Sequence, residues 1–307
     1  MLAPALLAPC LAIADGAPSP SAAVLADSTQ HGFMWEARKG GRHAYLMGTL
    51  HVGVSSDYPP AAAIVHRLSE VDAIVLEDDI SQQERSQAAA AKWAIYPGAE
   101  PGLEQRIDPA LRDDCERQLA RYGVPAAAAW RMKPWMLAMQ LVLLDGLALG
   151  YSPENATEVY LVKLARSGHK PIVELEGIEA QLRMLDSSPL PDQIEFLRQT
   201  VHSLESGEAE TELQELVAAW RGSDVAAMLK YLDQVRHSPE RAEREWFDRL
   251  VTRRNADMAA SIDQLLQDGH FYLVAVGSLH FFGDDGLVEQ LRRRGYTVTV
   301  VGAEAAP

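Results

Sequence analysis

The stretch Phe271–Gly286, FYLVAVGSLHFFGDDG, places a histidine between a buried strand and a helix. The apolar run Phe271–Val276 has the length and composition of a strand covered on both faces. The unit GSLH follows and ends in His280, and from Leu287 the apolar spacing predicts a helix. Ligands of open α/β sheets bind at the carboxyl ends of the strands. The stretch therefore predicts a ligand-binding position at His280.

The same arrangement occurs near the other end of the chain. The apolar residues Ala44–Met47 run into the unit GTLH, which ends in His51. One glycine after a strand is ordinary turn chemistry, but two near-identical units are much harder to attribute to chance. A single histidine at a strand end is more often a structural residue held by hydrogen bonds. The matched pair predicts one shared cleft to which His51 and His280 both contribute.

Size and charge limit the functions that the chain can have. Its 307 residues are 48% hydrophobic, which is enough for one large domain or two small ones. The formal net charge of −15 argues against nucleic-acid binding, which needs a concentrated basic surface. No apolar run reaches the roughly 20 residues of a membrane span. We therefore expect a peptide or small-molecule partner, and the sequence is also compatible with a homodimer.

The first residues resemble a secretory signal. Leu2–Ala14 is apolar and ends in the small-residue pattern of a cleavage site, although no Lys or Arg precedes it. We interpret residues 1–30 as a signal peptide and linker, and expect a periplasmic or secreted protein. Cys10 would leave with the signal, so Cys115 would have no intrachain disulfide partner.

Strand and helix patterns mix along the rest of the chain. Runs with strand composition are Phe33–Arg38, His43–Met47, Val71–Leu76, Pro171–Leu175 and Tyr296–Val301, besides the run before His280. Helical spacing is seen at Gln82–Ile95, Pro109–Tyr122, Ala126–Leu149 and Pro153–Ser167, and in three or four further helices within residues 191–267. We predict one α/β domain over residues 31–307. It has a central mixed sheet, flanking helices and a large helical insertion at about residues 81–150.

Polar residues stand at the predicted strand ends, namely His51, Glu77, Glu176 and His280. Two imidazoles and one or two carboxylates suffice for a divalent transition metal such as manganese, cobalt, zinc or iron. A metal lowers the pKa of bound water and polarises a carbonyl group, which favours hydrolysis. Structural alternatives exist, because Glu77 could pair with an arginine and Glu176 could complement the dipole of the following helix.

Other kinds of site have no comparable signature. The sequence has no GxSxG serine-nucleophile motif and no HExxH zinc motif. It also lacks GxxxxGK[ST] and GxGxxG, so nucleotide phosphate binding is not indicated. The two-histidine, carboxylate arrangement is therefore the strongest candidate site.

Five motifs, in order, resemble the TraB/PrgY/GumN family from about Trp35 to Val301. They are GTLH at Gly48–His51, VLE ending at Glu77, LEG…Q at Leu175–Gln181, RRN at Arg253–Asn255, and the closing VGSLHFFGDDGLVEQLRRRGY. That family is similar to the Tiki metalloproteases, which share paired GxxH motifs, and more distantly resembles the erythromycin-esterase and ChaN-like fold group. The resemblance implies a metal-dependent peptidase or hydrolase with both histidines in the site. One departure is Phe281-Phe282, which stands where family members often have Leu-Pro.

Two functional hypotheses follow. The first is an exported metal-dependent hydrolase, above all a peptidase, in which His51, Glu77 and His280 hold the metal. Glu176 would be a fourth ligand or the general base, and Arg254 would stabilise negative charge on the substrate or intermediate. The second hypothesis is a protein that binds or sequesters a peptide, haem or metal through the same histidines without turnover. The sequence leaves both open.

Overall fold

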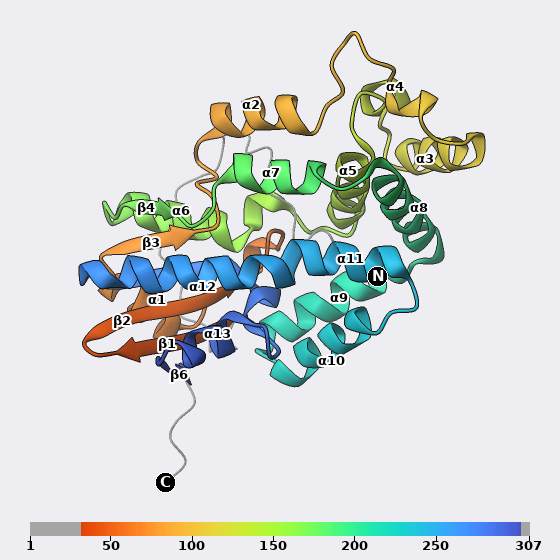
Figure 1. The fold of residues 1–307 in the computed structure, drawn as a ribbon. Coiled ribbons are helices and arrows are strands. Elements are labelled where there is room, and N and C mark those ends of the chain that lie inside the picture. The colour runs from red at the N-terminus through yellow and green to blue at the C-terminus, as the bar shows by residue number, and fades with distance from the viewer. Residues whose placement is uncertain (1–31, 302–307) are drawn as a thin grey trace.

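A computed structural model describes residues 32–301 of the chain. The predicted signal peptide and linker, with Cys10, lie outside the described residues. Within them, one mixed sheet of six strands has the order β4-β3-β5-β2-β1-β6 and carries helices on both faces (Figure 1). The predicted α/β class with a central mixed sheet is confirmed.

The centre of the sheet is parallel. Strand β5 (Tyr272–Gly277) lies between β2 (Arg42–Thr49) and β3 (Ala73–Leu76), and is parallel to both. Every residue of β5 is buried, as its unbroken apolar sequence predicts. Parallel strands end at one edge, so the two GxxH units and the residues after β3 meet there.

The outer strands are less covered. Strand β1 (Phe33–Lys39) forms a hairpin with β2 and pairs on its other side with β6 (Thr297–Val300), antiparallel to both. Strand β4 (Ile172–Glu174) closes the opposite edge beside β3. The sequence predicted strands at all of these places, but β4 and most of β6 are partly or fully exposed rather than buried.

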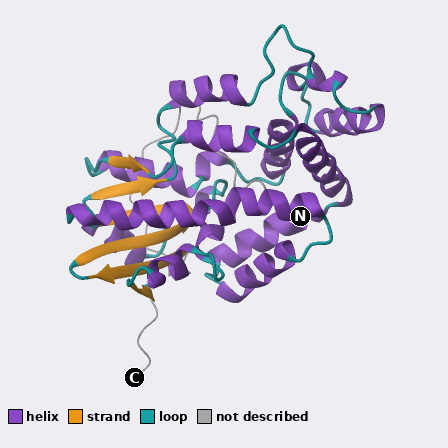
Figure 2. Cartoon of the chain, in the orientation of Figure 1, coloured by secondary structure: helices purple, strands orange, loops and turns teal. Residues whose placement is uncertain are grey.

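Helices come in two long runs between the strands. Between β3 and β4 lie α2 (Gln83–Trp93), α3 (Pro109–Arg121), α4 (Ala126–Ala129), α5 (Pro134–Ala148) and α6 (Thr157–Ser167). Between β4 and β5 lie α7 (Ile178–Asp186), α8 (Leu190–Ser206), α9 (Glu208–Arg221), α10 (Val225–Arg236), α11 (Arg241–Phe247) and α12 (Arg253–Leu265). The sheet occupies one end of the molecule, and α3–α5 and α8–α10 gather at the other (Figure 2). Among residues 32–301, no helix is long and apolar enough to cross a membrane.

The sheet has a different helical layer on each face. The remaining helices are α1 (Ala62–Glu70), which follows β2, and α13 (Leu287–Arg293), which follows β5. Apolar residues of α1 and α6 pack with Met47, Ile74 and Leu273 of the sheet in one core cluster. Residues of α12 and α13 pack on the other face, in the larger cluster that extends into the helical end of the molecule.

Two predicted helices are interrupted. The single helix predicted over Ala126–Leu149 is wrong, because α4 ends at Ala129 and α5 begins at Pro134. Proline disfavours helical geometry in the residue before it, and Lys133 is extended, with φ −72° and ψ 157°. The helix predicted from Pro153 begins only at Thr157, after a single 3-10 turn and the extended residue Ala156.

Helices α11 and α12 are continuous through a π-helical segment, Asp248–Thr252. The backbone N–H of Arg253 donates to the carbonyl of Asp248, five residues back, so the helix is locally widened. With α8, α9 and α10 this rod makes four helices across residues 191–267, within the predicted three or four. Widened turns of this kind are frequent at functional sites.

Candidate active site

The two GxxH units lie side by side at the carboxyl ends of β2 and β5. Thr49 pairs with Gly277, and the hydroxyl of Ser278 donates to the carbonyl of Thr49 at 2.9 Å. This contact explains the first glycine, because a Cβ on Gly48 would stand 2.8 Å from Ser278 Oγ. The units are offset by one residue, since Gly48 pairs with Val276 rather than with Gly277.

Glu77 follows β3 and is bound from three sides. Its Oε1 accepts from the backbone N–H of Gly277 at 2.7 Å, and its Oε2 accepts from Gln181 Nε2 at 3.1 Å and from Arg254 Nη2. The side chain is buried. Burial would raise the pKa of Glu77, but the charge of Arg254, together with the two histidines and the backbone N–H of Gly277, outweighs it and the pKa is lowered. Glu77 is therefore an ionised carboxylate at neutral pH.

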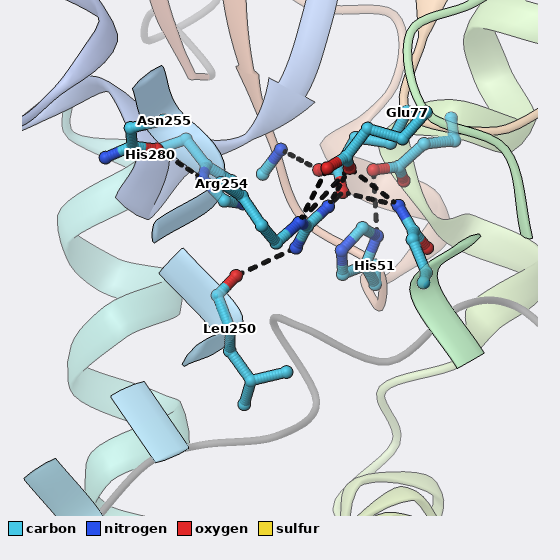
Figure 3. Close-up of polar contacts among 10 residues, drawn as sticks. His51, Glu77, Leu250, Arg254, Asn255 and His280 are labelled. Carbon is cyan, nitrogen blue, oxygen red and sulfur yellow. Dashed lines mark hydrogen bonds and ion pairs between the residues drawn. The ribbon is translucent and has the colours of Figure 1, made fainter. Parts of the chain in front are cut away.

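Arg254 reaches from α12 towards Glu77 (Figure 3) and also binds Glu176. Its Nε donates to both Glu176 oxygens at 3.1 Å, and its Nη1 donates to the carbonyl of Leu250 in the π-helical segment at 2.8 Å. Burial would lower the pKa of the guanidinium, but the two carboxylates raise it above its ordinary value. The structure thus joins three predicted site residues in one buried ionic network.

His280 is completely buried and is oriented by Asn255. The Asn255 amide nitrogen donates to the carbonyl of Asp285 at 2.9 Å, which fixes its oxygen towards His280 Nδ1 at 2.7 Å. Because that oxygen only accepts, Nδ1 carries the proton and Nε2 keeps its lone pair. Nε2 has no hydrogen-bond partner among residues 32–301. Burial, assisted by the charge of Arg254, lowers the pKa of His280 to about 3.

His51 has an acidic neighbour instead. Its Nδ1 lies 2.9 Å from Oε1 of Glu158, a buried residue in the first turn of α6. Burial would lower the pKa of His51, but the charge of Glu158, assisted by Glu77 and Asp78, raises it to about 9. The two histidines are close enough for the charge of His51 to lower the pKa of His280. His51 is therefore a cation at neutral pH, whereas His280 is neutral.

Four residues of the site had no role in the sequence prediction. Asn255 and Gln181 stand in the RRN and LEG…Q motifs, so the motifs themselves were the available signal. Asp78 directly follows Glu77, and burial together with the charge of Glu77 raises its pKa to about 7. Glu158 had no signal, because only the packing of α6 brings it to His51.

The donor chemistry fits a divalent metal that displaces the second ring proton of His51 on binding, since histidine ligates a metal as the neutral imidazole. The buried lone pair of His280 Nε2 is a suitable ligand, and each histidine has a polar group on its other ring nitrogen, as metal-binding histidines do. Glu77 already accepts three hydrogen bonds, but an ionised carboxylate has about four acceptor positions. No group of three or more His, Cys, Asp or Glu among the described residues is arranged to hold an ion. Metal binding by His51, Glu77 and His280 therefore stays a prediction.

Known proteins support the resemblance noted in the sequence. A sequence model of the TraB/PrgY/gumN family matches residues 33–300. Two curated relatives, each named "Uncharacterized protein YbaP", come from Shigella flexneri and Escherichia coli (strain K12). Each is 26% identical over 259 residues, covering 82% of this chain and 89% of the relative. No solved structure matches the chain, so the finer likeness to the ChaN-like fold group stays a prediction.

Proposed function

We propose that this chain, which belongs to the TraB/PrgY/gumN family, is a metal-dependent hydrolase whose substrate is a peptide. The observation that carries the proposal is the buried, unprotonated Nε2 of His280, which has no partner in the described residues and is held in place through Nδ1. Leaving a buried acceptor unsatisfied costs free energy, on the order of 1–3 kcal/mol. A ligand that accepts its lone pair accounts for that cost.

His51, His280 and Glu77 are the residues that would hold the ion. A bound divalent metal supplies a water of lowered pKa and polarises the substrate carbonyl. Asn255 keeps His280 in the tautomer whose Nε2 is unprotonated. Arg254 keeps Glu77 ionised and oriented, and because it is itself buried between two carboxylates, it acts by holding them.

Glu176 is the proposed general base. Its side chain is 18% exposed, against 9% for Glu77, so it is the more accessible of the two carboxylates bound by Arg254. A base that takes a proton from an entering water needs such access, together with a fixed orientation. The contacts with Arg254 and Gln181 provide the orientation.

Elemental analysis tests the proposal most directly. We expect stoichiometric metal in the wild type after incubation with manganese, cobalt or zinc, and its loss in both His51→Ala and His280→Ala. His237→Ala is the matched control, because the His237 side chain is 76% exposed. Peptide cleavage by the loaded wild type, abolished in Glu176→Gln with metal content retained, would support the assigned base.

Two results would redirect the proposal. Wild-type protein that stays metal-free with each ion contradicts the metallohydrolase. Stoichiometric metal without cleavage across a varied peptide library favours the alternative, a protein that binds its ligand without turnover.

A further inference from the structure

Glu158 is a buried carboxylate whose ion-pair partner is His51. It is the second residue of α6 and is 6% exposed. Apart from its 2.9 Å ion pair with His51, neither carboxylate oxygen has a hydrogen-bond partner among residues 32–301. Burying a carboxylate is costly unless it is paired. The ion pair with His51 therefore offsets part of the free-energy cost of burying this carboxylate.

The backbone is fastened on both sides of His51. Leu50 and Thr157 exchange two hydrogen bonds, from Leu50 N to Thr157 Oγ1 at 3.0 Å and from Thr157 N to the Leu50 carbonyl at 2.9 Å. Gly53 and Ser152 exchange two backbone hydrogen bonds, at 3.1 and 2.8 Å. These bonds bracket His51 on one segment, and the bonded residue Thr157 directly precedes Glu158 on the other. The register of the two segments is thereby fixed, and the carboxylate is delivered to Nδ1.

We propose that Glu158 is a positioning residue that fixes the ring of His51, so that the opposite ring nitrogen faces the metal position. The inference rests on the proposed function and adds to it a residue that no motif indicates. Carboxylates and amides on the second nitrogen of a metal-binding histidine set its tautomer and orientation. Asn255 already occupies the corresponding place at His280.

Two conservative variants distinguish the effect of the position of the Glu158 side chain from the effect of its charge. Glu158→Gln keeps the length and an acceptor oxygen but loses the charge. Glu158→Asp keeps the charge but withdraws the carboxylate by one methylene. Glu154→Asp, an exposed change in the adjoining turn, is the matched control. The readouts are the Kd for Co²⁺ at fixed pH, and the His51 Nδ1–H proton resonance in metal-free protein labelled with ¹⁵N-histidine and assigned with His51→Ala.

We expect Glu158→Gln to have a Kd for Co²⁺ close to that of the wild type. Glu158→Asp should bind Co²⁺ at least about 10-fold more weakly. The exchange-protected Nδ1–H resonance is expected in the wild type and Glu158→Gln, and lost in Glu158→Asp. Wild-type affinity in Glu158→Asp, or the reverse order of the two variants, overturns positioning.

Failure of the metal site itself is seen separately. If the wild type binds none of Mn²⁺, Co²⁺ and Zn²⁺, the proposed function fails, and the metal-free resonance alone decides the role of Glu158. A protected resonance that persists in Glu158→Asp then overturns positioning as well. Its loss in Glu158→Asp, with retention in Glu158→Gln and Glu154→Asp, supports positioning without a metal.

Discussion

The units GTLH and GSLH are nearly identical in sequence but hold their histidines in opposite electrostatic environments. His51 lies against the carboxylate of Glu158, and its pKa is raised to about 9. His280 is buried against the amide of Asn255 with Arg254 nearby, and its pKa is lowered to about 3. The comparison shows that a strand-end motif delivers a histidine to the site, while the helix packed beside it sets the charge.

The difference has a topological cause. Glu158 belongs to α6, which covers one face of the sheet, and Asn255 belongs to α12, which covers the other. The one-residue offset between the units gives His51 and His280 different positions relative to the strand ends. Each histidine therefore takes its partner from a different helical layer. The site can combine one cationic and one neutral imidazole, which two equivalent motifs would not provide by themselves.

Removing the cation beside Glu77 should have the largest effect. Arg254→Met leaves the buried Glu77 and the partly buried Glu176 without their counter-ion, and we expect a loss of about 3–5 kcal/mol in the free energy of unfolding. Urea denaturation measures it. The neighbouring Arg253, with a side chain 64% exposed, supplies the control Arg253→Met. Equal losses in the two variants would contradict a special role for the buried network.

The two histidines should give stability opposite dependences on pH in metal-free protein. The proton on His51 stabilises the fold fully below pH 6.5, and this contribution is lost as pH rises towards 9. His280 stays neutral in the fold but takes up a proton in the unfolded chain. The free energy of unfolding therefore decreases as pH falls from 6.5 towards 3. Each effect is on the order of 3 kcal/mol.

Thermal unfolding of the wild type, His51→Gln and His280→Gln across pH 4–9.5 measures both contributions. His51→Gln should flatten the alkaline side of the profile only, and His280→Gln the acidic side only. Parallel profiles for the two variants would mean that the histidines are electrostatically equivalent.

Gly48→Ala tests the close approach of the two units. The new Cβ would stand 2.8 Å from Ser278 Oγ and 3.2 Å from Ser278 Cα, and we expect a loss of about 1–3 kcal/mol from the resulting backbone shift. Gly98→Ala is the control, because a Cβ there meets nothing within 4 Å. The double variant Gly48→Ala, Ser278→Ala should recover part of the loss in urea denaturation. A harmless Gly48→Ala would show that the strand ends can separate freely.

Exchanging the carboxylate and amide partners of the two histidines should give the smallest effect, a change in each histidine pKa, and the most direct comparison of the two sites. Asn255→Asp places a carboxylate on His280 Nδ1 and should raise the pKa of His280 by about one unit. Glu158→Gln removes a carboxylate from His51 and should lower the pKa of His51 by a similar amount. NMR titration of the ring C–H resonances in metal-free protein measures both. Shifts of the same sign would show that the surrounding field, rather than the nearest partner, controls the two rings.

Much of the fold follows from local sequence pattern. Alternating and continuous apolar runs placed the strands, and Gly48 and Gly277, in the last residues of β2 and β5, marked their ends. The sequence prediction missed the helix break before Pro134, because apolar residues continue beyond it. The proline itself indicates such a break. Glu77, Arg254 and Glu176 were selected as strand-end or motif residues, and the structure joins them. Pairing of Glu77 with an arginine was foreseen as a structural alternative, but not that Arg254 would join Glu77 to Glu176, since that depends on how α12 lies across the sheet.

By itself, the sequence determined the family, the α/β class and the delivery of two histidines to one edge of the sheet. These properties depend on residues close together in the chain, through hydrophobic periodicity and turn chemistry. Only the tertiary structure decided that Glu158 faces His51, that Asn255 faces His280 and that Arg254 is buried between two carboxylates. Charge states depend on burial and on neighbours a few ångströms away, and those neighbours come from helices distant in sequence.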